Sequence, residues 1–163
     1  MRLLGSTDLA LRVLMRLSAE PDEHVSTDVL ARELAVSRHH LHKIVQYLSE
    51  IGLVRTIRGA RGGVMLARPA RKIRIGEFVR GHEKDQSLVE CFRPDGGACT
   101  LLPRCRLRGM LAAAKDAFYQ YLDRYTLADC LAATGSSARA SRKRPRRSGA
   151  TAPQRTSIRL KLA

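Results

Sequence analysis

The amino-acid sequence predicts a mainly α-helical protein with a small β-hairpin wing, in which a winged helix-turn-helix domain is followed by a long dimerisation helix. Three observations predict this fold. Apolar residues recur at helical spacing in three consecutive segments near the N-terminus. A Gly-rich, Arg-containing segment, 58–63, separates two short runs with strand character. Past Cys105, a further helical stripe continues for roughly 20 residues and consists of Leu107, Leu111, Ala114, Phe118, Leu122 and Tyr125.

The first two helices are expected between residues 6 and 34. Ser6 or Thr7 can cap the first helix, and Pro21 ends it. Ser26 or Thr27 can cap the second helix. The inward-facing positions of the two helices are Leu9, Val13, Leu14, Leu17, Val29, Leu30 and Leu34.

The third helix is expected to begin after Ser37, its predicted N-cap, and to stop at Gly52, which suits a left-handed backbone. A short turn at 35–37 joins it to the second helix, and two helices joined so tightly form a helix-turn-helix. Its predicted apolar stripe consists of Leu41, Ile44, Val45, Leu48 and Ile51.

The N-terminal end of this third helix carries the candidate DNA contacts, because that end enters the major groove in a helix-turn-helix. Arg38 could donate a bidentate pair to guanine, and Lys43 could reach a base or a phosphate. His39, His40 and His42 could add weaker or water-mediated contacts. The alternative is a merely solvated polar face. A metal site is disfavoured, since adjacent helical residues point about 100° apart and no acid or thiol lies nearby in the sequence.

The predicted wing comprises strands at 53–57 and 64–66. Arg58 and Arg61 between them could contact the minor groove or the DNA backbone, and glycines such as Gly62 permit a tight tip and a close approach to DNA. A nucleotide-binding loop is disfavoured, because this segment joins two strands and opens no helix with a Lys-Ser/Thr pair.

Three cysteines, Cys91, Cys99 and Cys105, lie in one loop that contains glycine and proline. Thiols crowded in this way, in a chain with no export signal, are more often reduced metal ligands than disulfides. Zinc, or an empty or oxidised thiol set, remains an alternative. Cys130 is expected in the core as a small hydrophobe. A thiol enzyme is disfavoured and no enzymatic activity is expected, because the nearest histidine, His82, belongs to no catalytic motif.

The chain has 163 residues and a net charge of +15, which indicates a polyanionic partner such as double-stranded DNA. Nine of those charges lie after Leu131, in a Ser-, Ala-, Pro- and Arg-rich tail that is expected to be disordered. Neither a signal peptide nor a membrane span is recognisable, so a soluble cytoplasmic protein is expected. The expected organisation is a DNA-binding domain at 1–80, a cysteine loop at 81–106, a dimerisation helix and short C-terminal helix at 107–131, and a basic tail at 132–163.

Several segments resemble the bacterial winged-helix iron-sulfur regulators. They are Thr7 to Arg12, Val36 to Ile44, Arg58 to Gly63, Ile73 to Gly76, Ser87 to Cys91 and Tyr125 to Asp129. The resemblance runs from about Arg2 to Leu131, leaves out the basic tail, and is specific in its ordered combination of wing, three-cysteine loop and Thr-Leu-Ala-Asp.

This resemblance implies a homodimeric repressor with an iron-sulfur cluster, 2Fe-2S or 4Fe-4S, held by Cys91, Cys99 and Cys105. It further implies a nitric-oxide sensor that leaves its DNA operator when the cluster is nitrosylated. A related cluster-assembly regulator uses a histidine where this chain has Arg108, so the fourth ligand must lie elsewhere. Asp8 of the partner subunit is the candidate, although a first-turn acid also suits the helix dipole. The alternatives are a regulator of iron-sulfur status or redox state, a zinc-structured DNA-binding protein, or a nonspecific one.

Overall fold

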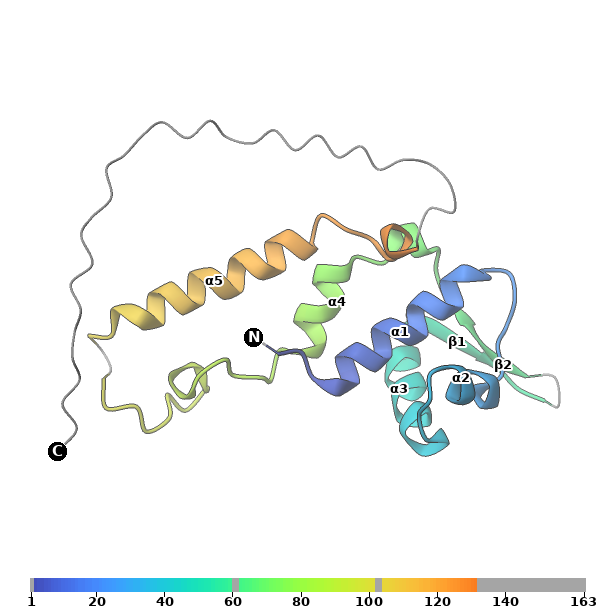
Figure 1. Ribbon diagram of the computed structural model, residues 1–163, viewed down its shortest axis with the longest axis horizontal. Helices are drawn as coiled ribbons and strands as arrows, with labels where there is room; N and C mark the ends of the chain where they lie inside the picture. The colour runs from blue at the N-terminus through green and yellow to red at the C-terminus, as the bar shows by residue number, and fades with distance from the viewer. Residues whose placement is uncertain (1, 60–61, 102–103, 132–163) are drawn as a thin grey trace, which may run out of the picture. The chain divides into compact units, whose positions relative to one another are not determined.

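The computed structural model describes residues 2–59, 62–101 and 104–131, which form helices and one two-stranded antiparallel sheet (Figure 1). This architecture confirms the predicted fold class. The predicted basic tail, 132–163, and the wing residue Arg61 lie outside the described residues.

Helix α1 spans Gly5–Ala19 and buries one face that includes Leu9, Val13 and Leu14. Its N-cap is Leu4, whose side chain makes no capping hydrogen bond, so the prediction of a Ser6 or Thr7 cap was wrong. The physical reason is tertiary. Thr7 lies inside the first turn, and its buried hydroxyl donates to Glu83 instead of accepting from an amide at the helix end.

Helices α2, Thr27–Glu33, and α3, Arg38–Glu50, begin at the predicted serine caps. The Ser26 hydroxyl oxygen accepts from the Val29 amide at 3.2 Å, and Ser37 accepts from the His40 amide at 3.2 Å. The tight turn between the helices contains Ala35 at φ 54°, a left-handed conformation that the sequence does not reveal. Gly52 adopts φ 68° after α3, as predicted.

Strands β1, Val54–Ile57, and β2, Gly63–Leu66, pair antiparallel with Val54 opposite Leu66. This confirms the predicted wing hairpin. An isolated bridge between Val25 and Val64 joins β2 to the segment that precedes α2. The predicted inward position of Ile51 was wrong: this residue follows the last residue of α3, where the chain turns toward Gly52, and it is 39% exposed.

One hydrophobic core joins α1, α2, α3 and the hairpin to the segments that follow the wing. Its fully buried members include Leu14, Leu30, Leu41, Leu48 and Leu127. The predicted apolar stripes of the first three helices supply nine of its buried members: Leu9, Val13, Leu14, Leu17, Leu30, Leu41, Ile44, Val45 and Leu48. The outer face of α3 is therefore left to polar side chains.

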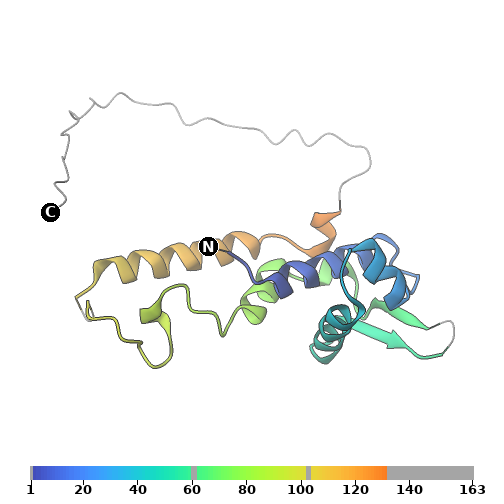
Figure 2. The same ribbon diagram turned by 60° about the horizontal axis from the view of Figure 1, so that its bottom comes forward.

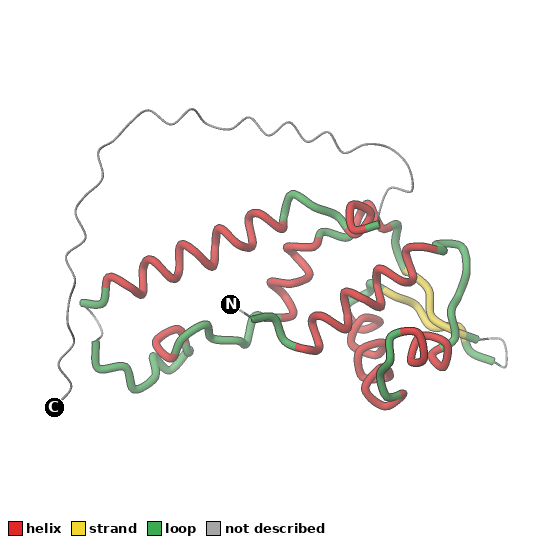
Figure 3. The backbone as a smooth tube through the Cα atoms, viewed as in Figure 1, coloured by secondary structure: helices red, strands yellow, loops and turns green. Residues whose placement is uncertain are grey.

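The chain continues through a short 3-10 turn, η1, at Ala70–Lys72 and helix α4, Ile75–His82. After the cysteine loop, which contains the turn η2 at Glu90–Phe92, helix α5 spans Arg106–Leu122 and turn η3 spans Leu127–Cys130. Helix α5 packs on α4, and Figures 2 and 3 show that the cysteine loop between these two helices in the chain is mostly irregular. A bridge between Arg74 and Thr126 anchors the end of this region.

Helix α5 buries one residue that lies outside the predicted stripe. Tyr119 is 5% exposed, whereas Leu107, in the predicted stripe, is 57% exposed. Phe118 and Leu122 are only partly buried against the core. Within the described ranges, no helix is both long and apolar enough to span a membrane.

Candidate nucleic-acid interface and cysteine loop

The N-terminal half of α3 presents a row of exposed polar side chains. Arg38, His39, His40, His42 and Lys43 are all exposed, while the apolar residues of the same helix are buried beneath them. The helix thus has one face in the core and an opposite face free for a partner. A basic face of this kind is complementary to DNA.

Arg38, the first residue of α3, forms an ion pair with Asp28 in the first turn of α2. The distance from Arg38 Nε to Asp28 Oδ1 is 3.0 Å, and the two side chains are 74% and 55% exposed. The sequence reasoning singled out Arg38 but missed Asp28. No local signal could have found it, because the pairing depends on the angle between α2 and α3.

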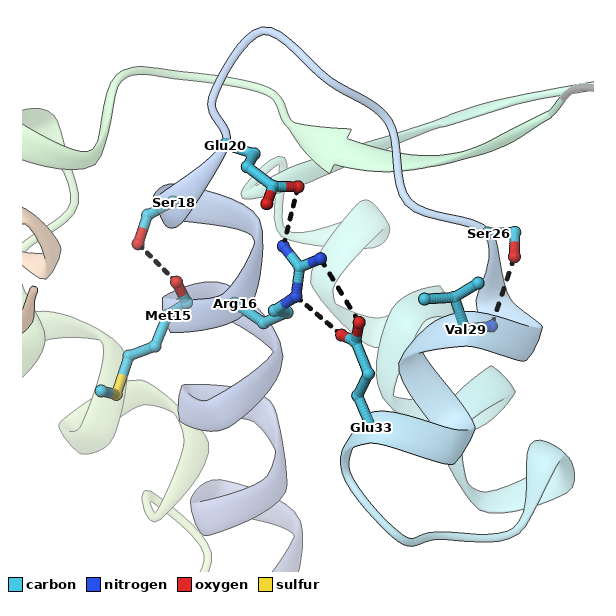
Figure 4. A network of polar contacts seen from close by, with 7 residues as sticks. All are labelled: Met15, Arg16, Ser18, Glu20, Ser26, Val29 and Glu33. Carbon is cyan, nitrogen blue, oxygen red and sulfur yellow. Dashed lines mark hydrogen bonds and ion pairs between the residues drawn. The ribbon is translucent and has the colours of Figure 1, made fainter.

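A second ion-pair network joins α1 to α2 (Figure 4). Arg16 Nε lies 2.7 Å from Glu33 Oε2, and Arg16 Nη1 lies 3.1 Å from Glu20 Oε2. The hydrogen bond with Glu33 is the main cause that raises the pKa of Arg16 above its ordinary value, against an opposing effect of burial. These contacts tie α2 to α1, and α1 in turn packs on α3.

Arg58 directly follows β1 in the wing, and it is exposed. Gly62 donates its amide to the Gly59 carbonyl at 2.8 Å, and an added Cβ at Gly62 would collide with the Ile57 carbonyl. The protein's own backbone therefore accounts for glycine at this position. Contact of Arg58 or Gly62 with DNA stays a prediction.

All three loop cysteines are free thiols, with Cys91 buried at 8% exposure and Cys99 and Cys105 half-buried. Cys91 lies in η2 and Cys105 is the residue that precedes α5. Among the described residues, no three His, Cys, Asp or Glu side chains are grouped as metal ligands. The loop thus carries the predicted thiols without gathering them into a ligand set in this conformation.

Contacts with α5 and within the loop hold the backbone around Cys91. Arg108 Nε donates to the Cys91 carbonyl oxygen at 3.3 Å, and the guanidinium lies 5.6 Å from the centre of the Phe92 ring. Glu90 Oε1 accepts from the Ala98 amide at 3.1 Å. Arg108 therefore anchors the loop backbone to α5.

Asp8 lies in the first turn of α1, with its side chain 63% exposed. Its Oδ2 lies 3.2 Å from Nε of Arg12, one turn along the same helix. Within this chain the carboxylate therefore faces outward, toward solvent, and its charge suits the positive end of the helix dipole.

The N-terminus of α1 is fastened to the end of α4. The Leu4 amide and the Thr7 hydroxyl both donate to Glu83 Oε1, the former at 2.9 Å. His82 Nε2 lies 3.0 Å from the Ser6 hydroxyl. Burial lowers the pKa of His82, with the negative charge of Glu83 opposing that effect. The sequence placed Glu83 in the cysteine loop, 81–106, and did not reveal that this residue is only 6% exposed.

Cys130 packs against the core as predicted, although it is only partly buried. Its thiol lies 3.7 Å from the Thr126 carbonyl, and burial raises the pKa of that thiol. This cysteine is separate from the loop and belongs to η3.

The side chains of the loop fit an iron-sulfur cluster in their chemistry. Three free thiols lie within one irregular loop, and thiolates are the usual ligands of such clusters. Cys105 also stands at the N-terminal end of α5, where the helix dipole favours negative charge.

Comparison with known proteins gives consistent matches. The Rrf2 family, described as "Iron-dependent Transcriptional regulator", matches residues 4–133. The HTH-type transcriptional regulator NsrR of Geobacillus kaustophilus is 46% identical over 132 residues, which cover 80% of this chain and 90% of that protein. The protein of the same name in Bacillus subtilis is 41% identical over 130 residues, covering 79% and 89%.

Solved structures agree with this relationship. CymR, the global cysteine regulator of B. subtilis, aligns with a TM-score of 0.65 at 27% identity and covers 80% of this chain and 95% of that one. IscR of T. potens has a TM-score of 0.63 at 22% identity, with coverage of 84% and 93%, and supports the fold. These relatives are regulators, which confirms that the chain is not an enzyme. The chain belongs to the Rrf2 family of DNA-binding transcriptional regulators.

Proposed function

We propose that the protein is a homodimeric repressor that binds operator DNA through α3 and the wing, and that an iron-sulfur cluster controls this binding in response to nitric oxide. Cys91, Cys99 and Cys105 would hold the cluster, with Asp8 of the partner subunit as the fourth ligand. The observation that carries the proposal is the loop with three free thiols next to a winged helix-turn-helix, in a chain 46% identical to a regulator named NsrR.

The cluster, when bound, supplies iron that nitric oxide can attack, and a carboxylate is a harder ligand for iron than a thiolate. The chain's own residues explain how a change in the loop could reach DNA. Arg108 ties the loop at Cys91 to α5, and α5 packs on α4. Glu83, at the end of α4, holds the first turn of α1, which carries Asp8. Helix α1 packs on the recognition helix α3.

Dimerisation through α5 is part of this proposal. Leu107, Met110 and Tyr121 of α5 are 57%, 61% and 55% exposed, an unusual apolar content for a solvated helix face. A second copy of the same helix would cover them. A dimer would also place two copies of α3 on successive major grooves of an operator.

The test is a nitric oxide titration of anaerobically purified protein, followed by visible absorption and by DNA-binding anisotropy on one sample, with iron, sulfide and zinc assayed. We expect a sulfur-to-iron charge-transfer band that bleaches in proportion to the nitric oxide added, together with release of DNA. Replacement of Cys91, Cys99 or Cys105 by Ser should abolish the band.

Cys130→Ser is the matched control, because Cys130 is a half-buried thiol outside the loop, and it should keep the band. Asp8→Ala should leave the thiol ligands in place but alter the spectrum or the nitric oxide response. A colourless protein that contains zinc and no iron would contradict the cluster. A band that bleaches while DNA stays bound would contradict the regulatory link.

A further inference from the structure

We propose that Asp28 is a specificity-determining residue for DNA recognition: it holds the guanidinium of Arg38 in the orientation that reads a guanine in the major groove. The inference rests on the proposed function in one respect, that the N-terminal end of α3 enters the groove. It adds a residue on α2, outside the recognition helix, to the reading of sequence.

The geometry of the ion pair supports this role. A carboxylate oxygen of Asp28 lies 3.0 Å from Arg38 Nε, which makes this an ion pair at the Nε side of the guanidinium. Among the described residues, none accepts a hydrogen bond from Nη1 or Nη2 of Arg38. A bidentate contact with guanine requires two N–H groups directed at O6 and N7. The two terminal nitrogens of Arg38 remain available for that contact while Nε faces Asp28.

Preorganisation is the physical benefit. The rotamer entropy of an arginine side chain amounts to about 2 kcal/mol. Most of this entropy is lost when the side chain binds a base, which weakens binding. Asp28 reduces the number of orientations that Arg38 samples before DNA arrives. Both partners stand on short helices with serine caps, so the carboxylate and the guanidinium are held on fixed backbones.

The charge of Asp28 adds selectivity. Arg38 without a partner would bind any nearby phosphate, which adds affinity but no sequence information. A carboxylate beside Arg38 repels phosphate and compensates part of the charge of Arg38. A guanine, which offers two aligned acceptors and no negative charge, is favoured over a phosphate in that arrangement.

The pair has little value for stability. Both side chains are more than half exposed, and exposed ion pairs contribute little to folding. The effect of losing Asp28 should therefore be seen in DNA selectivity and not in thermal unfolding.

The experiment uses the anaerobically purified full-length protein and a pool of DNA duplexes with a randomised core, from which bound duplexes are sequenced. We compare the wild type, Asp28→Ala, Arg38→Ala and the double variant. The wild type should enrich a motif with a guanine position that disappears in Arg38→Ala. Asp28→Ala should lower the preference for guanine at that same position by about threefold or more, and should tighten binding to a random duplex.

Glu33→Ala is the matched control. Glu33 is an acid on the same helix with 41% exposure that pairs with Arg16 and not with α3 (Figure 4). This variant removes the same charge and should leave the guanine preference intact. In the Arg38→Ala background, Asp28→Ala should change no base preference further, since Asp28 acts through Arg38.

Four results would overturn the proposal, and they are distinguishable. If Asp28→Ala keeps the full guanine preference, or if Glu33→Ala lowers it equally, Asp28 does not determine specificity. If the motif contains no position that depends on Arg38, the protein reads DNA by other residues and only this inference fails. If the wild type enriches no motif, sequence-specific regulation itself is contradicted, and this inference with it.

Discussion

Thr7, in the first turn of α1, donates a hydrogen bond to the carboxylate of Glu83, from which it is separated by 76 positions in the chain. Thr7 is 0% exposed and Glu83 is 6% exposed. The same carboxylate oxygen accepts from the Leu4 amide. A buried carboxylate is expensive unless it is hydrogen-bonded, so these donors are the reason that the end of α4 and the start of α1 stay together.

Thr7→Val should therefore destabilise the protein. The change keeps the shape of the side chain but removes one of two donors to a buried carboxylate, which should cost about 1–3 kcal/mol. Urea unfolding followed by circular dichroism gives the free energy of unfolding. Thr27→Val, at the half-buried start of α2, is the control; an equal loss there would show that the Thr7 hydroxyl has no special role.

Stability should fall on mild acidification because of His82. Burial lowers its pKa in the folded protein below the ordinary value of 6.5. The unfolded chain therefore binds the proton first, so the contribution of neutral His82 is complete above about pH 6.5 and is lost as the pH falls below it. Its ring makes a T-shaped contact with Tyr47, at 4.6 Å between ring centres, and lies 5.7 Å from the Phe78 ring, while its neighbours Ser6 and Glu83 provide the polar contacts.

The measurement is the unfolding free energy between about pH 7.5 and pH 5. Protonation of carboxylates in this range affects all variants alike, so it cancels when their profiles are compared. His82→Asn should flatten the part of this profile just below pH 6.5. His39→Asn, which changes an exposed histidine on α3, should leave the profile as it is in the wild type. An identical profile for the wild type and His82→Asn would refute the assignment.

Gly76→Ala should loosen the contact between α4 and the end of α5. A Cβ at Gly76 would lie 2.6 Å from the Asp123 amide nitrogen and would collide with that residue's carboxylate. Asp123 also forms an ion pair with Arg80 at 2.6 Å, so its displacement breaks a second contact. We expect a loss of about 1–3 kcal/mol in unfolding free energy.

Gly81→Ala is an unusually direct control, because Gly81 lies on the same helix and its added Cβ would meet no atom within 4 Å. Alanine favours helix over glycine, so this variant should be neutral or more stable by up to about 1 kcal/mol. If the two variants lose equal stability, steric collision at Gly76 is not the cause.

Met110→Glu should weaken or abolish the dimer. Met110 is 61% exposed on α5, and a charge at the centre of an apolar interface is costly unless it is paired. Light scattering coupled to size-exclusion chromatography, over a range of concentrations, gives the mass of the assembly. Gln120→Glu introduces the same charge at another exposed position on α5 and should leave the dimer intact. A wild-type protein that is monomeric at all concentrations would contradict the proposed assembly.

Features governed by near neighbours in the chain were predictable from the sequence. Ser26 and Ser37 cap α2 and α3 because their hydroxyl oxygens accept from amides only three residues further on. Gly52 ends α3 because a left-handed backbone favours glycine. The periodic positions of Leu41, Ile44 and Leu48 identified the buried face of the recognition helix, and hence its exposed face.

The sequence by itself thus determined the winged helix-turn-helix, the exposed basic end of α3 and a loop with three thiols. Only the tertiary structure decided that the Thr7 hydroxyl donates to Glu83 instead of capping α1. It also decided that Arg38 pairs with Asp28 and that Tyr119 is the buried residue of α5. The physical reason is the same in each case. These contacts join segments whose relative angle and distance are set by packing of the whole core, and hydrophobic periodicity within one helix carries no information about the partner it meets.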